Sequence, residues 1–444
     1  VEAEGHYRAA LELVETEAER ADLLGELGRV LFRQSRYDET ITVWQAGITQ
    51  YQALGRLDGV AGLYARAARA ASVQGDTPRG LALCREGVAA VAGAPESPDL
   101  ADLLHETARA CLFNGLPDEA APLCHRALEM AERLGAIRVQ AEALTTLSIL
   151  PGQPQEEALS AVTRAVELAE SEGLLPQAYR AHQNLGGGLD DARAAREHLL
   201  RALELARQRG DIGWELYSAC RAAFRSLQLG ELAAVEEALP SLRQLLDETG
   251  KTGAAARRLR GLEVTLLRYQ GELVGAIDGL QSLRREARAA GDLRELRLLN
   301  LELAMACIWE EVGEEEDFEA MLQETGDLTQ WAMWPVVLSR CLLSVQRARQ
   351  GEPEAARQLL AKAREQGAEH DSTMGESYLS WAEAHLARAE GHWSEALAAF
   401  ETAIDRLGRA KLRWYRARTL VDWAKAHLAR GESGDRERAQ ILLR

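Results

Sequence analysis

The chain has 444 residues and a formal net charge of −17, with 69 acidic against 52 basic residues. Hydrophobic residues make up 47% of it and aromatic residues 5%, a composition typical of helical proteins with a substantial core. The negative balance argues against nucleic acid and anionic membranes as partners, because both would repel the chain. The six cysteines are widely separated and lie among Ala and Leu, so we expect buried, reduced thiols in a cytoplasmic protein.

The two ends of the sequence indicate a fragment. The first residues do not form a signal peptide, and no apolar run reaches the ~18 residues of a membrane span. The chain begins without Met and ends at Ile441-Leu442-Leu443-Arg444, within an apolar helical pattern. We therefore expect one domain of a longer protein, cut at both ends.

Glycines recur along the chain at a regular spacing. One series lies at positions 75, 115, 152, 186–188, 230, 271, 313, 351, 391 and 431, so nine intervals span the 356 residues from Gly75 to Gly431, with a mean period of 39.6. A second series alternates with it at positions 55, 135, 173, 210, 250, 291, 367 and 408. Each period therefore holds two predicted helices of about 15 to 20 residues. Each helix is expected to end at a glycine in the left-handed conformation.

Within these segments the apolar residues follow helical spacing, as in Leu397, Phe400, Ala403, Ile404 and Leu407. No long alternating stretch predicts a sheet. A single helical hairpin cannot bury both of its apolar faces, whereas stacked hairpins form one continuous core. The predicted fold is all-α, an α-solenoid superhelix of about eleven helical hairpins that forms a single domain over residues 1–444.

Small residues have fixed places in each predicted hairpin. In residues 391–403, a glycine is followed by an aromatic residue after two positions, Ala after five, a large apolar residue after nine and Ala after twelve. Small side chains let paired helices approach closely. The pattern resembles the tetratricopeptide repeat (TPR), with a period near 40 rather than 34. The same spacing recurs at Gly115, Ala120, Cys124 and Ala127, at Gly351, Ala356, Leu360 and Ala363, and at Gly271, Ala276, Leu280 and Leu283.

The junctions between predicted helices resemble those of one protein class. Leu-Gly and Gly-Asp pairs, as at Leu54-Gly55, Gly210-Asp211 and Gly291-Asp292, are similar to those in the sensor regions of signal-transduction ATPases with numerous domains (STAND). The resemblance implies a nucleotide-binding and oligomerisation module upstream of this sequence.

No motif in the sequence predicts catalysis. A G-x-x-x-x-G-K-[ST] stretch and a G-x-S-x-G stretch are both absent, and the nine histidines show no metal-ligand spacing. The only glycine cluster, Gly186-Gly187-Gly188, is interpreted as a shortened helix end with a tight turn, and alternatively as a hinge or an anion-binding backbone. We expect no catalytic residue, no cofactor and no metal, and therefore not an enzyme.

Two adjacent segments have opposite charge. Residues 251–297 carry ten basic and six acidic residues, whereas residues 302–327 carry ten acids and no Lys or Arg. One interpretation is a pair of solvated helix faces that attract each other along the stack. The other is a polarised docking surface for a partner or for another domain of the same protein.

The TPR resemblance also places a candidate ligand groove. Counting back from the turn glycines gives the first-helix positions that face the inside of a TPR superhelix. Aromatic and arginine side chains there suit ligand recognition, because they bury much area and keep a polar group. Substitution of Trp381 and Arg388 is thus expected to weaken ligand binding without loss of stability, although such residues could instead pack between helices. The candidates are Asp102, His105, Arg109, Tyr217, Phe224, Arg258, Arg268, Tyr378, Trp381, His385 and Arg388.

Two functions fit this sequence. The first is the ligand-binding sensor of a STAND-type ATPase, which recognises an inducer in the concave groove and relays its presence to the nucleotide-binding module. The second is a permanent TPR scaffold for protein assembly. The length of the groove favours a protein or peptide ligand over a small molecule. Other domains of the same chain are expected partners, and nucleic acid and membrane are not; the fragment itself is expected to be monomeric and without ATP turnover.

Overall fold

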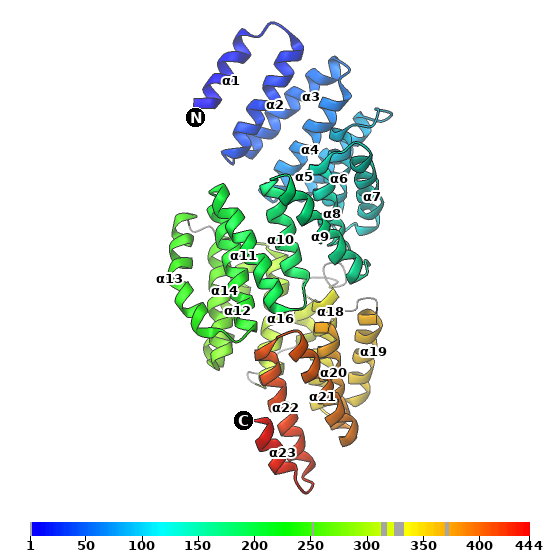
Figure 1. Ribbon diagram of the computed structural model, residues 1–444, viewed down its shortest axis with the longest axis vertical. Coiled ribbons are helices and arrows are strands. Elements are labelled where there is room, and N and C mark those ends of the chain that lie inside the picture. The colour runs from blue at the N-terminus through cyan, green and yellow to red at the C-terminus, as the bar shows by residue number, and fades with distance from the viewer. Residues whose placement is uncertain (1, 251–252, 312–317, 324–332, 369–372) are drawn as a thin grey trace. The chain divides into compact units, whose positions relative to one another are not determined.

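The computed structural model describes residues 2–250, 253–311, 318–323, 333–368 and 373–444. In these residues every regular element is a helix, and no helix is long and apolar enough to cross a membrane. After α1 (Glu2–Leu13), the described helices follow one another in the chain as eleven pairs (Figure 1). The predicted all-α fold of helical hairpins is confirmed. The even-numbered helix of each pair is called the first helix below, and the odd-numbered helix the second.

Unit 1 is the first of two compact units and holds Val1–Leu150 and Ser160–Gln177. Its helices are α1, α2 (Glu17–Arg33), α3 (Tyr37–Ala53), α4 (Leu57–Gln74), α5 (Thr77–Ala90), α6 (Pro98–Phe113), α7 (Pro117–Arg133), α8 (Ile137–Leu147) and most of α9 (Gln155–Ser171).

Unit 2 holds Pro151–Leu159 and Ala178–Arg444. Its helices are most of α10 (Leu175–Gly188), then α11 (Ala192–Arg209), α12 (Ile212–Gln228), α13 (Leu232–Glu248), α14 (Gly253–Gln270), α15 (Leu273–Ala289), α16 (Leu293–Ala304), the π-helical segment η1 (Met305–Trp309), α17 (Phe318–Gln323), α18 (Met333–Arg349), α19 (Pro353–Ala368), α20 (Thr373–Ala389), α21 (Trp393–Arg409), α22 (Arg413–Arg430) and α23 (Asp435–Leu442).

Most of the predicted turn glycines do end helices. Gly75 and Gly210, for example, have φ angles of 99° and 65° at the ends of α4 and α11. Glycine adopts this left-handed conformation without a steric penalty from Cβ. Two predictions are wrong: Gly367 and Gly408 lie inside α19 and α21, and after α21 the left-handed residue is Lys411, with φ 57°. Gly313 lies outside the described residues.

The predicted small positions are where paired helices meet. Ala120, Cys124 and Ala127 on α7 are each 0% exposed. In α2, a Cβ atom on Gly28 would lie 2.1 Å from Nε1 of Trp44, so the α3 indole occupies the space that a side chain would need. The same indole nitrogen donates to the Gly25 carbonyl oxygen at 3.1 Å. This close approach is the packing that the TPR spacing predicts.

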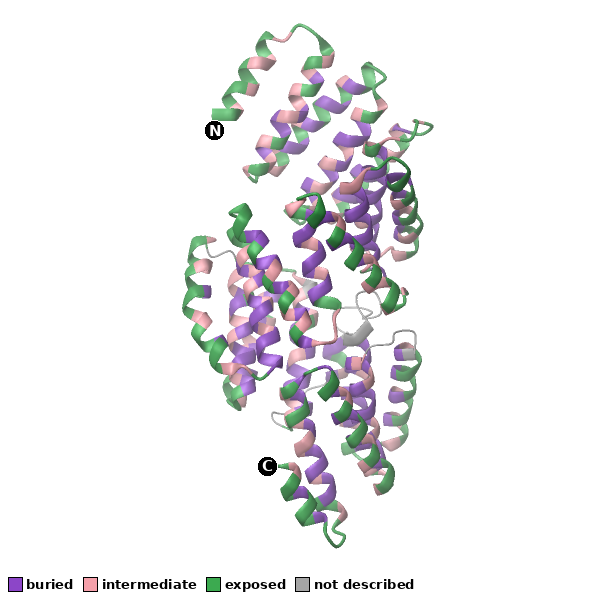
Figure 2. Cartoon of the chain, viewed as in Figure 1, coloured by how far each residue is buried: buried purple, intermediate pink, exposed green. Residues whose placement is uncertain are grey.

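Burial follows the faces by which helices contact their neighbours (Figure 2).

Among the cysteines, Cys307 is half-buried and the other five are buried, and all six are free thiols. Burial raises the pKa of the Cys84 thiol to about 12, so this thiol stays protonated and packs as a small apolar residue.

Candidate functional site

The first helices form the inner layer of unit 1. In its described residues, α4 packs on α6 and α6 packs on α8, whereas the second helices α3, α5 and α7 share no comparable contact with one another. Helices on the inside of a curved stack are closer together than those on the outside. Side chains on the free faces of α4, α6 and α8 therefore line the inner wall of unit 1.

A network of charged side chains crosses three of these first helices. Arg69 on α4 contacts three carboxylates through Nη2, at 2.6 Å from Glu106, 3.0 Å from Glu142 and 3.4 Å from Asp102. Arg138 on α8 contacts Asp102 at 2.9 Å and Glu142 at 3.2 Å. The three carboxylate side chains are only 2–5% exposed, so these contacts compensate charges that water does not reach.

Predicted residues of α6 complete the network. Arg109 donates to Glu106 at 2.9 Å, and Nε2 of His105 lies 2.9 Å from the Thr146 hydroxyl. Three arginines then balance three carboxylates. His105 and the carboxylates Asp102, Glu106 and Glu142 lie close enough to hold a metal ion, but guanidinium groups already occupy the carboxylate oxygens, so the arrangement fits an ion-pair network better.

Charge compensation keeps the buried Glu106 carboxylate ionised. Burial by itself raises the pKa of Glu106, but the neighbouring guanidinium groups of Arg109 and Arg69 outweigh it and hold that pKa well below its usual range. The Glu106 carboxylate therefore remains charged at neutral pH. Of the predicted groove residues, the structure brings Asp102, His105 and Arg109 together here, with His105 fully buried and Arg109 half-buried.

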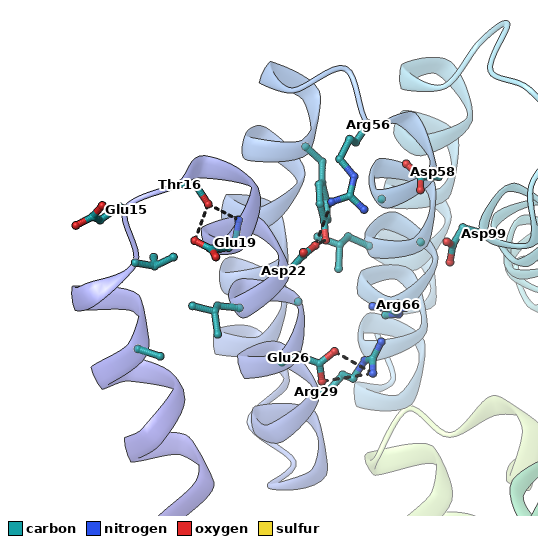
Figure 3. Close-up of a pocket in the computed structure, with 18 of the residues that line it drawn as sticks. Glu15, Thr16, Glu19, Asp22, Glu26, Arg29, Arg56, Asp58, Arg66 and Asp99 are labelled. Carbon is teal, nitrogen blue, oxygen red and sulfur yellow. Dashed lines mark hydrogen bonds and ion pairs between the residues drawn. The ribbon is translucent and has the colours of Figure 1, made fainter.

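A pocket of about 1000 Å³ opens beside this network (Figure 3). Its lining comes from the end of α1, from α2 and α4, from the loops that flank them, and from Tyr51 on α3 and Asp99 on α6. Tyr51 donates to Asp22 at 2.5 Å, and Arg56 contacts the same carboxylate at 3.3 Å. Arg29 pairs with Glu26 at 3.1 Å. The charged residues of the lining are Glu15, Glu19, Asp22, Glu26, Arg29, Arg56, Asp58, Arg66 and Asp99.

The first helices of unit 2 have a different inner surface, which aromatic side chains fill. Trp309 stacks on Trp381 with ring centroids 4.5 Å apart, and lies 5.7 Å from Tyr378 and 5.6 Å from Tyr415. Trp309, Tyr378 and Trp381 are at most 1% exposed. These side chains come from η1, α20 and α22 and form one buried cluster.

Contacts within unit 2 join helices that are distant in the chain. Tyr269 on α14 stacks on Trp414 of α22 with ring centroids 4.2 Å apart, and α12 also contacts α22. Arg418 on α22 donates to the Trp309 carbonyl oxygen and contacts Glu310 at 2.9 Å. The described first helices of unit 2 thus close on one another, instead of each contacting only its neighbours in the chain.

Four predicted groove residues lie in this closed interior. Tyr378 and Trp381 are in the aromatic cluster, and the Trp381 indole donates to Asp422 at 3.0 Å. His385 is 4% exposed and lies 3.4 Å from the same carboxylate, and Arg268 is 3% exposed. The prediction of an open groove does not hold for these four in this structure, because helices from the same unit cover them.

The other predicted residues of unit 2 remain accessible. Arg258 on α14 is exposed, and its guanidinium lies 4.4 Å from the ring centroid of the half-buried Tyr217 on α12. Phe224 and Arg388 are half-buried. Arg258 and Tyr217 are therefore the predicted pair of unit 2 that a ligand could reach, and their role in binding stays a prediction.

The structure shows where the glycine cluster and the charged segments lie and what they contact. Gly186, Gly187 and Gly188 end α10 as helical residues, and a Cβ on Gly186 would lie 2.7 Å from the Leu199 side chain, so close packing replaces the predicted tight turn. Glu302 pairs with Arg268 at 3.3 Å, as attraction along the stack predicts. Glu310, by contrast, pairs with Arg418 of α22. Residues 251–252, 312–317 and 324–327 of the charged segments lie outside the described residues.

Four of the six charged residues of the network were not predicted from the sequence. Arg69, Glu106, Arg138 and Glu142 were not among the predicted residues, although a sequence signal exists. Glu106 follows Arg69 by 37 positions and Arg138 follows Asp102 by 36, close to one repeat. Opposite charges one repeat apart on successive first helices occupy the same register and can pair.

The comparisons with known proteins concern the fold. No protein-family model and no curated protein matches the sequence. The apo form of RapI is 10% identical with a TM-score of 0.50, over 60% of this chain and 97% of RapI. A STAND protein with a tetratricopeptide repeat sensor from Pyrococcus horikoshii is 12% identical with a TM-score of 0.48, and the match covers 72% of this chain but only 48% of that protein. The human IFIT1 dimer with m7Gppp-AAAA is 13% identical with a TM-score of 0.45, over 86% of this chain and 90% of IFIT1. The chain has a TPR-like helical-repeat fold.

Proposed function

We propose that this chain is the sensor domain of a STAND-type signalling ATPase, which recognises a peptide or protein inducer on the first helices of unit 1. The observation that carries the proposal is the contrast between the inner surfaces of the two units. In unit 1 the first helices border a large pocket whose lining includes charged side chains of both signs, whereas in unit 2 the first helices bury an aromatic cluster. The Leu-Gly and Gly-Asp junctions of the sequence support the STAND context.

A sensor also needs two conformations between which the ligand discriminates. In an array where each hairpin contacts only its neighbours, small rotations add up smoothly. Unit 2 instead carries contacts between distant helices, such as the stack of Tyr269 on Trp414. Packed contacts of this kind are either made or broken, so they suit a two-state element. We propose that binding to unit 1 shifts this equilibrium through α9 and α10, to which both units contribute residues.

Hydrogen exchange separates the sensor from the scaffold. The whole chain is incubated with a library of random peptides capped at both ends, a binder is selected, and amide exchange is measured with and without it. A sensor should show protection on first helices of unit 1 and, in addition, changed exchange in α14 and α22, which hold the stack of unit 2. Protection confined to the binding surface, with α14 and α22 unchanged, would instead identify a scaffold.

Nucleotide turnover supplies a second test. We expect the chain alone to be monomeric and not to hydrolyse ATP, and we expect the selected peptide to change the ATPase rate of the longer natural protein. An ATPase rate that is the same with and without bound peptide would contradict the sensor function.

A further inference from the structure

The pocket of unit 1 contains charged groups of both signs that have no ion-pair partner. Among the described residues, no Lys or Arg nitrogen lies within 4.0 Å of a carboxylate oxygen of Asp58 or Asp99, and no carboxylate lies within that distance of Arg66. The other two arginines of the pocket have ion-pair partners, since Arg56 pairs with Asp22 and Arg29 pairs with Glu26. Figure 3 shows Asp58, Asp99 and Arg66 around the same space, with no interaction drawn to them.

Two of these groups, Asp99 and Arg66, are half-buried, whereas Asp58 is exposed. Burial raises the pKa of Asp99; the Arg66 guanidinium lowers it, but the nearby Asp102 and Asp58 carboxylates raise it, so the pKa stays above its ordinary value. Burial lowers the pKa of Arg66, and repulsion from the Arg29 guanidinium acts in the same direction; the Asp99 and Asp102 carboxylates, which do not reach ion-pair distance, oppose this shift without cancelling it. A partly buried charge without a partner is costly, so a group of opposite charge would be stabilised strongly at either place.

The backbone of α4 leaves space for one of these charged groups, the Asp99 carboxylate. A Cβ atom on Gly62 would lie 2.6 Å from Oδ1 of Asp99. Only glycine at this position therefore allows the α6 carboxylate to lie against α4. Beside it, Gly25 and Leu63 give the pocket an apolar part. The volume of about 1000 Å³ is at the upper end for ligand pockets, which suits a peptide segment better than a single ion.

We propose that this pocket binds a peptide segment that carries one basic and one acidic side chain, the basic group at Asp58 and Asp99 and the acidic group at Arg66. The inference rests on the proposed function, since it names the class of peptide that the sensor recognises. The apolar part of the pocket contacts the aliphatic portions of the same side chains. A purely basic or purely acidic peptide would leave one of the two places unpaired.

The test uses random hexapeptides that are acetylated and amidated, so that only side chains supply charge. Peptides selected on the whole chain should contain both Lys or Arg and Asp or Glu. Calorimetry with the best peptide should show that Asp99→Asn and Arg66→Gln each weaken binding about 10-fold to 100-fold. If Asp99→Asn fails to fold, Asp58→Asn, at an exposed position, tests instead whether the acidic part of the pocket binds the basic side chain of the peptide.

The chain offers matched controls on α7, outside the pocket. Asp118 follows Pro117 in the first turn of α7 as Asp99 follows Pro98 in α6, so Asp118→Asn controls for the charge at a helix start. Arg126→Gln, at an exposed position of the same helix, controls for the lost guanidinium. Both controls should leave the affinity within about twofold of the unsubstituted chain.

The remaining outcomes separate this inference from the proposed function. Selected peptides with one sign of charge, or full affinity in Asp99→Asn and Arg66→Gln, would overturn the pocket assignment. Protection from hydrogen exchange that, within unit 1, lies outside α1, α2, α4 and α6 would also overturn it, while a peptide-binding function would stand. If no peptide binds anywhere on the chain, both proposals fail.

Discussion

Replacing Arg69 by methionine should destabilise unit 1 by about 3 kcal/mol. The Arg69 guanidinium contacts three carboxylates that are 2–5% exposed, and without it Arg109 and Arg138 remain to compensate three negative charges. Removal of one partner from a buried ion pair costs about 3–5 kcal/mol. The lower end applies here, because 29% of the Arg69 side chain is exposed and water can enter the vacated space.

Hydrogen exchange of α6 is the suitable assay, since repeat arrays need not unfold in one step. A loss of about 3 kcal/mol corresponds to about 100-fold faster exchange of protected amides. The matched control is Arg85→Met, which breaks the 3.0 Å pair with Glu119 on the surface of the same unit, where both side chains are more than half exposed. Exposed pairs contribute about 0–1 kcal/mol, so exchange should rise less than about fivefold.

A second variant tests the cause of the effect. If uncompensated charge destabilises the Arg69→Met chain, adding Glu106→Gln should recover part of the loss, because it removes one buried carboxylate charge. Equal exchange rates in Arg69→Met and Arg85→Met, or no recovery in the double variant, would refute the reasoning.

Three further substitutions test the packing. Trp381→Ala should lower the free energy of unfolding by about 3–5 kcal/mol, as is usual when a buried tryptophan is removed. The sequence alone instead predicts unchanged stability. Thermal unfolding distinguishes the two, and an unchanged Tm would restore the groove interpretation. Gly28→Ala should cost about 1–3 kcal/mol through overlap with the Trp44 indole, while Gly25→Ala, whose Cβ would lie 3.7 Å from its nearest neighbour, should not destabilise; equal urea midpoints would contradict this. For Asp422, burial raises the pKa, but hydrogen bonds and charge attraction from His385, Arg418 and Trp381 outweigh burial and hold the pKa below its ordinary value of 3.8. The ionised carboxylate therefore stabilises the folded chain above pH 4, and this stabilisation is lost as the pH falls further. Asp422→Asn should flatten this loss in acid unfolding curves, and an unchanged slope would count against it.

The sequence by itself determined the repeating unit. Helical spacing of apolar residues, small residues at fixed places and turn glycines such as Gly75 act within one hairpin or between neighbouring hairpins. Such interactions depend on residues that are close in the chain, so their pattern can be recognised without coordinates. The count of first-helix positions also leads to Asp102, His105 and Arg109, which the structure places together in the charged network of unit 1; a role for them in ligand binding stays a prediction.

Only the tertiary structure decided which inner surfaces are open. The first-helix position that gives Asp102 gives Tyr378 in a later repeat, yet Asp102 lies in the charged network of unit 1 and Tyr378 lies in the buried aromatic cluster of unit 2. The difference arises from contacts such as Tyr269 with Trp414, between helices several hairpins apart. The position of a residue along a helix determines which way its side chain faces. Whether that side chain is buried also depends on which helix packs opposite it. The packing of distant helices is set by small rotations summed over many hairpins.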